Sequence, residues 1–368
     1  MRIDFGNWTP DAGPQSAGVV DALNVLPGEE GYITYNAAVA DGDAIPARCQ
    51  GLFHAKAADG TVYTYGCTGA EIYSRTGLTW TQITGGPYTT DPADFWVAIQ
   101  WDEALILTNG REAIQALTLG DAATTDLSAD APVAAAMDRV QQFLVVGDTT
   151  DGTDGHVPYR VRWSGFNDPS SWVVAVDTGA DFQDLNSTYG AVRAVVGGEY
   201  GTVFQERAIT RLTYAGHGPG RVTFERDEVE RGPGLWGANS AIKTGSFVGF
   251  LSEDGFRIWD GAQSVQIGAG EIDRWFNRNL DSSGAYLVQG GYDPARTMIW
   301  WIWPTNAANQ NCDKALVYNY GSAPNKRRWT VVDLESETVG TLVQPAWTLE
   351  DFDVYGAIEN IPYSLDSA

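Results

Sequence analysis

Histidine, serine and glycine patterns are the first places to look for chemistry in this 368-residue sequence. Its three histidines, His54, His156 and His217, lie about 100 and 61 residues apart, and none has a cysteine or second histidine at the spacing of a zinc site. There is no Gly-x-Ser-x-Gly elbow to expose a nucleophilic serine and no Gly-x-x-x-x-Gly-Lys loop to hold a phosphate. From these patterns we predict no catalytic residue, no metal site and no cofactor.

Carboxylates are harder to exclude, because 47 acidic residues guarantee chance neighbours and a glycosidase needs only two of them. No pair stands out from that background. The segment 77–80 is similar to the end of the Asp-box turn of sialidases, yet Arg75 stands where the aspartate would fall. Asp148, Asp151 and Asp154 lie in a glycine-rich loop and carry the oxygen ligands that calcium prefers. We interpret the first segment as an ordinary turn and the second as a solvated acidic loop.

Cysteine and targeting signals are sparse. Cys49, Cys67 and Cys312 are too few, and odd in number, for a disulfide scaffold, so we expect buried side chains that act as small hydrophobic groups. The N-terminus carries no apolar stretch followed by a small-residue cleavage site, and no apolar run approaches the roughly 20 residues that cross a bilayer. We therefore expect synthesis in a host cytoplasm and a soluble product with no membrane-spanning segment.

The charge balance disfavours a nucleic-acid-binding role. The formal net charge at pH 7 is -24, from 23 basic and 47 acidic residues, whereas affinity for a phosphate backbone comes mainly from Lys and Arg. The run of three basic residues at 326–328 is more simply a local salt partner than a DNA-binding patch. With 42 glycines and 14 tryptophans but only 19% charged residues, the composition is typical of a turn-rich all-β protein.

Short strands and turns recur along the chain at a regular interval. The first group predicts four strands separated by glycine-containing turns, and similar groups follow with a mean step of about 48 residues, which suits the blades of a β-propeller. The expected strands are 48–56, 61–67, 70–75 and 79–83; 95–101, 104–108 and 112–119; 140–147, 159–165 and 172–176; 191–197, 202–206, 209–216 and 222–229; 236–244, 247–252, 256–259 and 264–267; and 285–292, 297–303, 315–320 and 328–332. We therefore predict an all-β fold, a β-propeller of about six blades, six or seven, each a four-stranded antiparallel sheet.

Tryptophans and one polar segment add detail to this pattern. Trp80, Trp172 and Trp329 each open a predicted fourth strand, which we interpret as a signature of the end of a blade. Residues 271–276 predict a short connecting helix with an acidic first turn.

The two ends of the chain differ from the repeating part. Residues 1–30, with prolines among Gly and Asp, predict an extended N-terminal arm, which leaves 31–368 for the propeller. A seventh module begins with 338–348 and 353–358 and then stops. Because an open propeller would leave a bare strand edge, we expect either closure by an N-terminal strand at 31–35 or a native protein longer than this chain.

Three segments together resemble the tail nozzle or hub proteins of short-tailed bacteriophages. They are residues 20–28 (VDALNVLPG) with Gly31 and Tyr32, residues 161–172 (VRWSGFNDPSSW) and residues 250–261 (FLSEDGFRIWDG), and the runs 204–212 and 267–275 fit the same pattern. The likeness spans most of the chain in order, and each motif is a turn-and-strand signature without chemistry of its own. Members of that family run longer, so the resemblance adds to the expectation that the native protein continues past residue 368.

The resemblance implies a structural virion protein with no enzymatic activity. Six propeller subunits would form a homohexameric ring below the portal and adaptor, build the lower tail tube for DNA ejection, and carry tail fibres or tip proteins. Genomic DNA would be only a transiting cargo, and an acidic lumen, in a ring carrying six times -24, would repel it rather than bind it.

Aromatic residues in and beside the arm are the candidates for gripping neighbouring subunits. We pick Phe5, Trp8 and Tyr32, because aromatic side chains commonly anchor interfaces. The alternative that we keep is that they merely cover the side of the propeller.

A carbohydrate-active propeller, either a glycosidase or a lectin-like receptor binder, is the alternative function. It would need a central funnel lined by an acid pair and stacked tryptophans, for which Trp300, Trp301 and Trp303 are the candidates. Consecutive aromatic residues in one strand more simply pack both faces of a blade.

Overall fold

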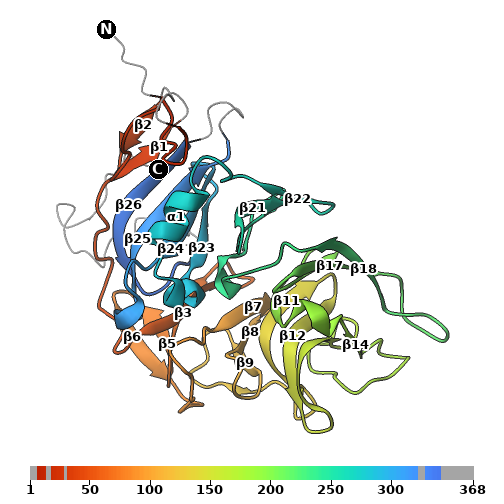
Figure 1. Cartoon of the computed structure of the whole chain (residues 1–368). Helices are drawn as coiled ribbons and strands as arrows, with labels where there is room; N and C mark the ends of the chain where they lie inside the picture. The colour runs from red at the N-terminus through yellow and green to blue at the C-terminus, as the bar shows by residue number, and fades with distance from the viewer. Residues whose placement is uncertain (1–5, 14–17, 29–30, 322–327, 341–368) are drawn as a thin grey trace.

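The computed structural model of the chain describes residues 6–13, 18–28, 31–321 and 328–340, and the structural statements below concern these residues. Six antiparallel sheets of four strands follow one another along this part of the chain, and in each sheet every strand pairs with the next in sequence (Figure 1). The strands are β3 (Cys49–Lys56), β4 (Val62–Thr68), β5 (Ile72–Thr76) and β6 (Thr79–Ile83); β7 (Val97–Trp101), β8 (Ala104–Thr108), β9 (Gln115–Thr118) and β10 (Thr125–Asp126); β11 (Val133–Val140), β12 (Phe143–Asp151), β13 (Gly155–Trp163) and β14 (Asp181–Asp184); β15 (Val192–Val196), β16 (Gly201–Gln205), β17 (Ala208–Tyr214) and β18 (Phe224–Arg231); β19 (Ile242–Lys243), β20 (Val248–Ser252), β21 (Gly255–Trp259) and β22 (Ser264–Gln266); and β23 (Gln289–Asp293), β24 (Met298–Trp303), β25 (Cys312–Asn319) and β26 (Arg328–Ser336).

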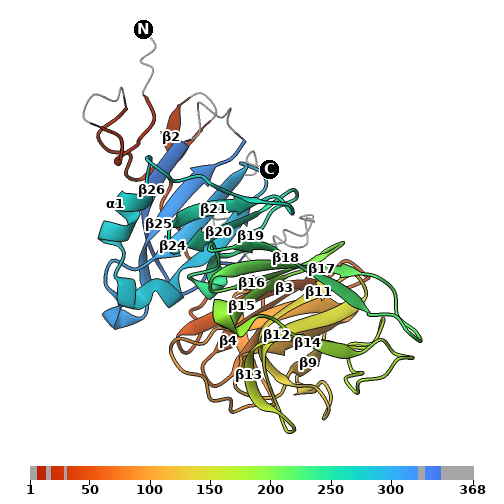
Figure 2. The same ribbon diagram turned by 45° about the vertical axis from the view of Figure 1, so that its right-hand side comes forward.

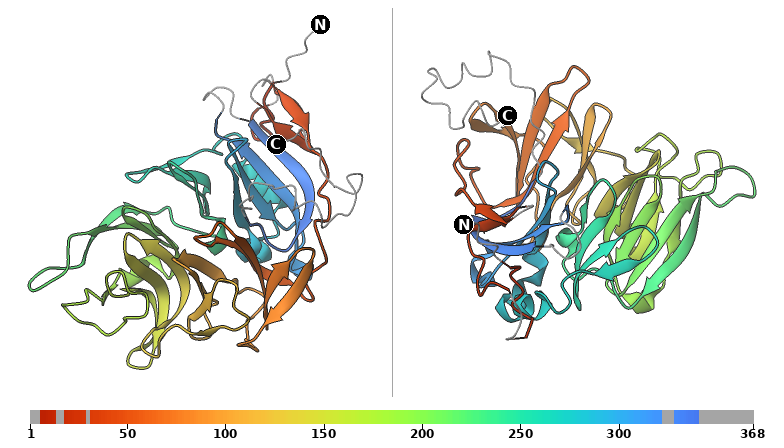
Figure 3. Two further views of the ribbon diagram at one scale, coloured as in Figure 1. Left: turned by 180° about the vertical axis from the view of Figure 1, so that it is seen from behind. Right: turned by 90° about the horizontal axis from the view of Figure 1, so that it is seen from above.

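The six sheets are the blades of a β-propeller, numbered here from the N-terminus (Figure 3). One channel of about 660 Å³ is lined by β3, β7, β11, β15 and β23 and by residues 238–241, which lead into β19. The first strand of each blade is therefore the inner one. This confirms the predicted all-β propeller of four-stranded antiparallel blades and gives six blades in the described part of the chain.

Small side chains let the inner strands converge on the channel. β11 contains three consecutive alanines, and β23 contains two consecutive glycines. A Cβ atom added at Gly290 would lie 2.9 Å from the Ser240 carbonyl oxygen of blade 5, so only glycine fits at this approach of two blades.

Blades 1 and 4 agree with the predicted strands to within two residues at every end. Blade 3 does not: its inner strand β11 was not predicted, the expected strand 140–147 belongs mainly to β12, and 172–176 is a loop. The alanines of β11 have a weak intrinsic preference for strands, so pairing with β12 and packing against neighbouring blades must hold this segment extended. The short β10 and β14 were missed as well.

The tryptophan signature is correct for two blades and wrong for the third. Trp80 and Trp329 lie in the fourth strands β6 and β26, whereas Trp172 lies in the loop between β13 and β14. Its Nε1 donates to the Pro169 carbonyl oxygen at 2.8 Å, and its ring is buried in a cluster with residues of blade 2. A turn-forming segment thus holds this ring, and no strand is needed.

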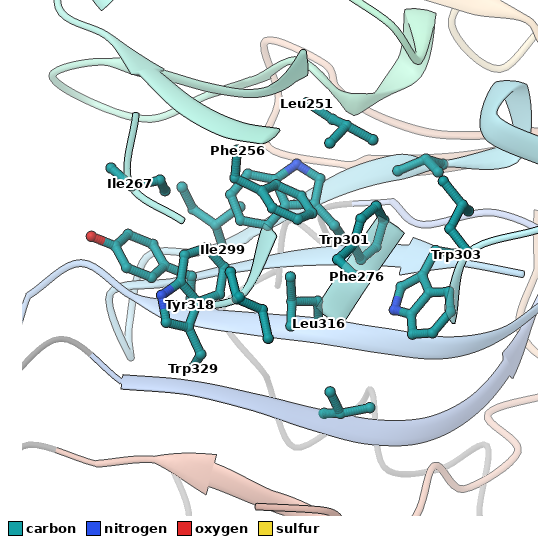
Figure 4. Packing of buried hydrophobic residues seen from close by; sticks show 14 of the residues in the cluster. Leu251, Phe256, Ile267, Phe276, Ile299, Trp301, Trp303, Leu316, Tyr318 and Trp329 are labelled. Atoms are coloured by element: carbon teal, nitrogen blue, oxygen red, sulfur yellow. The ribbon is translucent and has the colours of Figure 1, made fainter. Parts of the chain in front are cut away.

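The largest hydrophobic core lies between blades 5 and 6 and includes the predicted helix, observed as α1 (Asp273–Asn279). Phe276 of α1 packs edge-on against Phe256 and Trp303, with ring centroids 4.8 and 5.2 Å apart (Figure 4). Four short 3-10 turns complete the helical segments, at Ser187–Tyr189, Ala238–Ser240, Ser282–Leu287 and Ala307–Asn309.

The N-terminal segment lies on the outer side of blade 6 (Figure 2). It forms a hairpin of β1 (Val25–Pro27) and β2 (Tyr32–Thr34), so the boundary predicted at residue 30 falls within this hairpin. At the other end, Thr338 and Val339 lead from β26 back to the channel wall. The rest of the predicted seventh module, from residue 341 onward, lies outside the described residues.

Candidate interaction surfaces

The predicted interface residues of the arm are placed differently from one another. Trp8 is 3% exposed and packs edge-on against Trp275 of α1, with ring centroids 5.0 Å apart. The Trp8 amide donates to the Tyr32 hydroxyl at 2.8 Å, and this hydroxyl donates to the Gly6 carbonyl oxygen at 3.3 Å. Phe5 lies outside the described residues. Trp8 and Tyr32 therefore hold the arm on its own propeller, and their contact with a partner stays a prediction.

The arm also covers the edge of the last strand. Leu23 bridges to Val331 of β26 in parallel, with hydrogen bonds from the Asn24 amide to the Val331 carbonyl (2.8 Å) and from the Val331 amide to the Ala22 carbonyl (3.0 Å). The side chain of Asn24 then pairs with Asp333 through two hydrogen bonds of 2.8 Å. The N-terminal segment thus grips the last blade through residues 22–24. The expected closing strand at 31–35 is wrong in this detail, because 32–34 pairs with 25–27 instead.

Arg48 adds a second link between the first and last blades. Its guanidinium donates to the carbonyl oxygens of Gln310 (3.1 Å) and Pro92 (3.0 Å) and lies 5.5 Å from the centre of the Phe95 ring. The amide of Cys49 next to it donates to the Glu337 carboxylate at 2.7 Å. Within the described residues, side-chain hydrogen bonds from Arg48 and to Glu337 therefore join the first and last blades, and no strand is shared between their sheets.

A buried carboxylate supports α1 and the arm. Asp273 is 6% exposed; it accepts hydrogen bonds from the Phe256 amide (3.0 Å) and Gln266 Nε2 (3.2 Å). Burial raises its pKa to about 6, and the charges of Asp11 and Asp254 add to the rise, while these hydrogen bonds oppose it. Asp11 of the arm also caps the helix, since its Oδ2 accepts the Arg274 amide at 2.6 Å.

The three aspartates considered for calcium are engaged with basic groups. Asp154 and Asp151 lie 2.5 and 3.6 Å from Arg160, and Asp148 lies 2.6 Å from His156. Their oxygens thus serve ion pairs and local turns. Among the described residues, no group of three or more His, Cys, Asp or Glu side chains is arranged to hold a metal ion.

The other candidate residues have structural contacts. His54 and His217 hydrogen-bond Thr64 (2.9 Å) and Tyr214 (2.7 Å), and burial lowers the pKa of His54. All three cysteines are buried free thiols, as expected, and burial raises the pKa of Cys312 to about 12. Arg75, at the position of the missing Asp-box aspartate, forms an ion pair with Asp41 at 3.0 Å.

The tryptophans considered for sugar stacking do not line the channel. Trp301 and Trp303 are fully buried in the core between blades 5 and 6, and Trp300 packs against Tyr35 with ring centroids 6.1 Å apart. The three side chains thus pack the two faces of β24, as the simpler interpretation held. The aromatic platform that a carbohydrate site requires is not formed by them.

Charged residues that line the channel form ion pairs. Asp94 pairs with Arg111 at 2.7 Å, and Arg193 pairs with Glu206 at 2.6 Å. This channel runs through one propeller and is distinct from the lumen of a ring of subunits, so the acidic lumen stays a prediction.

An exposed apolar surface on blades 3 and 4 was not predicted. We call it the loop surface; its six side chains are between 36% and 60% exposed, and they are Phe166, Val173, Val174, Val176, Phe182 and Val222. Two loops carry most of it, 164–180 between β13 and β14 and 215–223 between β17 and β18. Scattered exposed apolar residues are ordinary, but five on adjoining loops together with Phe182 of β14 mark a place for interaction.

Specific contacts hold the two loops against each other. The Thr223 hydroxyl donates to the Gly179 carbonyl oxygen at 2.9 Å, and the ring of His217 lies 5.1 Å from that of Phe166. Trp163 Nε1 also donates to the Gly179 carbonyl, at 2.8 Å. The apolar side chains therefore project from a fixed platform. The valines at 173–176 were the available sequence signal, and we interpreted them as a strand.

A smaller exposed apolar site lies on the arm. Val20 is 98% exposed and Leu23 44%, on either side of the exposed acid Asp21 and the buried Ala22. We call Val20, Asp21 and Leu23 the arm surface. It lies at the end of the molecule opposite the loops that carry the loop surface, as the views in Figures 1, 2 and 3 agree.

Comparisons with known proteins bear on the fold alone. No family model and no curated protein matches the sequence. Solved structures with a similar fold include the Cps50 (Swd1) β-propeller domain of Myceliophteria thermophila, 9% identical over 68% of this chain and 79% of that one with a TM-score of 0.42. Hsv2 of Kluyveromyces lactis is 10% identical over 73% and 81%, with a TM-score of 0.39. YCF48 of Cyanidioschyzon merolae is 8% identical over 65% and 76%, with a TM-score of 0.40.

The described part of the chain is a six-bladed β-propeller, a class that its own strand pairing defines. No helix in the described ranges is long and apolar enough to span a membrane. Because propellers host unrelated functions, the function must be argued from the surfaces of this chain.

Proposed function

We propose that the protein is a structural subunit of a bacteriophage tail, a nozzle or hub without enzymatic activity, whose copies assemble into a ring. The observation that carries this proposal is the loop surface, six apolar side chains, five on two fixed loops and one on β14, that are left open to solvent in the single chain. Such a surface favours protein–protein contact, because covering it removes apolar area from water.

The residues that could do chemistry support a non-enzymatic role. The histidines contact a threonine, a tyrosine and an aspartate, and the aspartates of the glycine-rich loop pair with basic side chains. Buried thiols with a raised pKa are poor nucleophiles, and this holds for Cys67 and Cys312. These groups therefore have structural partners in place of substrates.

The segments that resemble tail nozzle proteins contain the arm surface and one residue of the loop surface. Residues 20–28 contain the arm surface, and residues 161–172 contain Phe166 and end directly before Val173 of the loop surface. A shared pattern at such places is what related assemblies would need, since interface residues must match between subunits.

The partners and location follow from the same proposal. The ring, with six copies, would lie below portal and adaptor proteins, carry fibres or tip proteins, and belong to the virion after synthesis in the host cytoplasm. Ejected DNA would pass through it without strong binding, because a net charge of -24 per copy disfavours contact with phosphates.

Electron microscopy tests the proposal, applied both to the purified full chain and to particles that contain it. We expect a six-fold ring or short tube, and no release of sugars when the protein is incubated with bacterial surface glycans. A monomer at every concentration, with no ring in particles and with glycan cleavage, would refute the structural role.

A further inference from the structure

The loop surface is exposed in the single chain, and another exposed apolar surface of the same chain, the arm surface, could cover it in an assembly. We propose that the loop surface of one copy binds the arm surface of the next copy, in a head-to-tail contact. This rests on the proposed ring-forming role and names the two surfaces that build the ring.

Geometry requires the contact to be between copies. The arm lies on the outer side of blade 6, whereas the two loops project from blades 3 and 4 at the far end of the molecule (Figure 1). The two surfaces of one chain cannot meet, because both are fixed to the same rigid propeller. A contact between two different surfaces of identical subunits is heterologous, and it closes into a ring when the rotation per subunit allows.

The two surfaces match in apolar character. Leu23 stands out from a backbone that residues 22 and 24 fix to β26, and Val20 follows Val19, whose amide donates to the Asn7 carbonyl oxygen, so little reordering is needed before they bind. Val222 and the valines of the 164–180 loop are likewise presented from hydrogen-bonded loops. Mutual burial would cover the most exposed apolar side chain of the described residues, Val20, and the largest cluster of exposed ones.

The two surfaces carry residues of opposite charge. Asp21 lies within the arm surface and is exposed. The loop 215–223 contains Arg221 and His217 and no acid, and Arg221 directly precedes Val222. Asp168 and Asp177 belong to the other loop, 164–180, Asp181 precedes Phe182, and Glu225 shares a pocket with Arg221 and Val222, so the positive charge of the surface is confined to the 215–223 loop. We therefore place Asp21 of one copy opposite Arg221 of the next.

Charge-reversing substitutions at Asp21 and Arg221 of the full-length chain test this placement. Sedimentation velocity and mass photometry measure the association of the variants. We expect Asp21→Lys and Arg221→Glu each to weaken association about tenfold or more, and the double variant to recover most of the loss, because the pair is restored with reversed sign. Arg231→Glu is the matched control: it makes the same charge change on an exposed arginine at the opposite end of β18 and should leave association unchanged. Circular dichroism confirms that each variant is folded.

Oxidative cross-linking of cysteine variants gives the orientation of the contact. When one chain carries both Val20→Cys and Val222→Cys, we expect a series of disulfide-linked oligomers that ends at the closed ring. A chain that carries only one of these substitutions should not cross-link. Dimers from a single variant would overturn the head-to-tail arrangement. If microscopy shows rings but the charge-reversing substitutions do not change association, the head-to-tail contact is refuted and the ring-forming role stands. If no ring forms in solution or in particles, the contact and the ring-forming role are both refuted.

Discussion

The arm on blade 6 and the loop surface on blades 3 and 4 are two apolar regions on the outside of one propeller, and they differ in what covers them. Trp8 is buried by its own chain against α1, and β26 has its edge paired by residues 22–24. Phe166, Val174 and Val222 have comparable apolar character but remain open to solvent. Folding of the single chain buries the apolar residues of the first region, whereas we propose that those of the second region are buried only when copies assemble.

The difference teaches that a closed propeller does not use all of its apolar surface for closure. The arm and Arg48 join the last blade to the first, whereas the loop surface contributes nothing to that closure. Mutations in the two regions should therefore separate the stability of the fold from the strength of assembly. The following predictions test this separation, from the largest expected effect to the smallest.

Trp8→Ala should destabilise the fold by roughly 3 to 5 kcal/mol, because it removes a fully packed aromatic side chain. Phe166→Ala, an aromatic truncation in the loop surface, should cost about 1 kcal/mol or less, since its ring is 43% exposed. Urea unfolding followed by tryptophan fluorescence and circular dichroism measures both. Equal losses of free energy for the two variants would remove the distinction between the regions.

Asp273 should make the stability of the arm-bearing side depend on pH. Its pKa of about 6 lies above that of the unfolded chain, so its contribution to stability is greatest below about pH 4 and is lost as the pH rises through 6. Relative to the parent chain, Asp273→Asn should therefore gain roughly 2 kcal/mol between pH 4.5 and pH 8, because only part of the effect of a shift of about two pKa units falls within this range. Thermal unfolding across this range measures the difference, which would be constant if the carboxylate had an ordinary pKa.

Arg48→Ala should cost about 2 kcal/mol, because it removes two hydrogen bonds from a charged donor that join blades 1, 2 and 6, one of them partly buried and one exposed. Arg231→Ala is the control, since this side chain is 71% exposed and should change stability by about 0.5 kcal/mol or less. Denaturant unfolding compares the two. If Arg48→Ala has no effect on stability, the arm and the hydrogen bond from the Cys49 amide to Glu337 are sufficient to join the first and last blades.

Substitutions of Asn24 should have the smallest effect on the free energy of unfolding, and this effect is local to the contact between the arm and β26. Its φ angle of 56° is in the left-handed region, and its side chain pairs with Asp333. Asn24→Gly should cost about 1 kcal/mol for the lost hydrogen bonds, and Asn24→Ala about 1 kcal/mol more for backbone strain. Amide exchange at Val331 should quicken in both variants. If Ala is tolerated as well as Gly, the strained turn does not contribute to the grip of the arm.

The blades could be predicted from sequence where local signals dominate. In blade 1 glycine-containing turns separate alternating strands, and these signals need no knowledge of distant residues. The inner strand β11 was missed because its alanines carry no strand signal, and its conformation comes from its neighbours. Local chemistry thus specifies the turns, and packing specifies the rest.

The surfaces could not be predicted in the same way. The valines at 173–176 look like a strand because β-branched residues favour strands, and a pattern does not distinguish burial in the chain's own core from burial by another copy. Trp8 is predicted to contact a neighbouring subunit, and in the structure it packs against Trp275 of its own chain, which lies far away in sequence, so this contact could not be predicted from a local pattern. The exposure of the valines at 173–176 and the burial of Trp8 both depend on contacts between residues that are far apart in sequence or in different copies.

Hydrogen–deuterium exchange of the full chain, measured below and above the concentration of ring assembly, tests the central claim most directly. The amides of Asn24 and Val331 should be protected in both states, because their hydrogen bonds belong to the single chain. Peptides covering 164–182 and 215–223 should gain protection only on assembly. Equal exchange of these loops in both states, or protection of the arm amides only on assembly, would contradict the account.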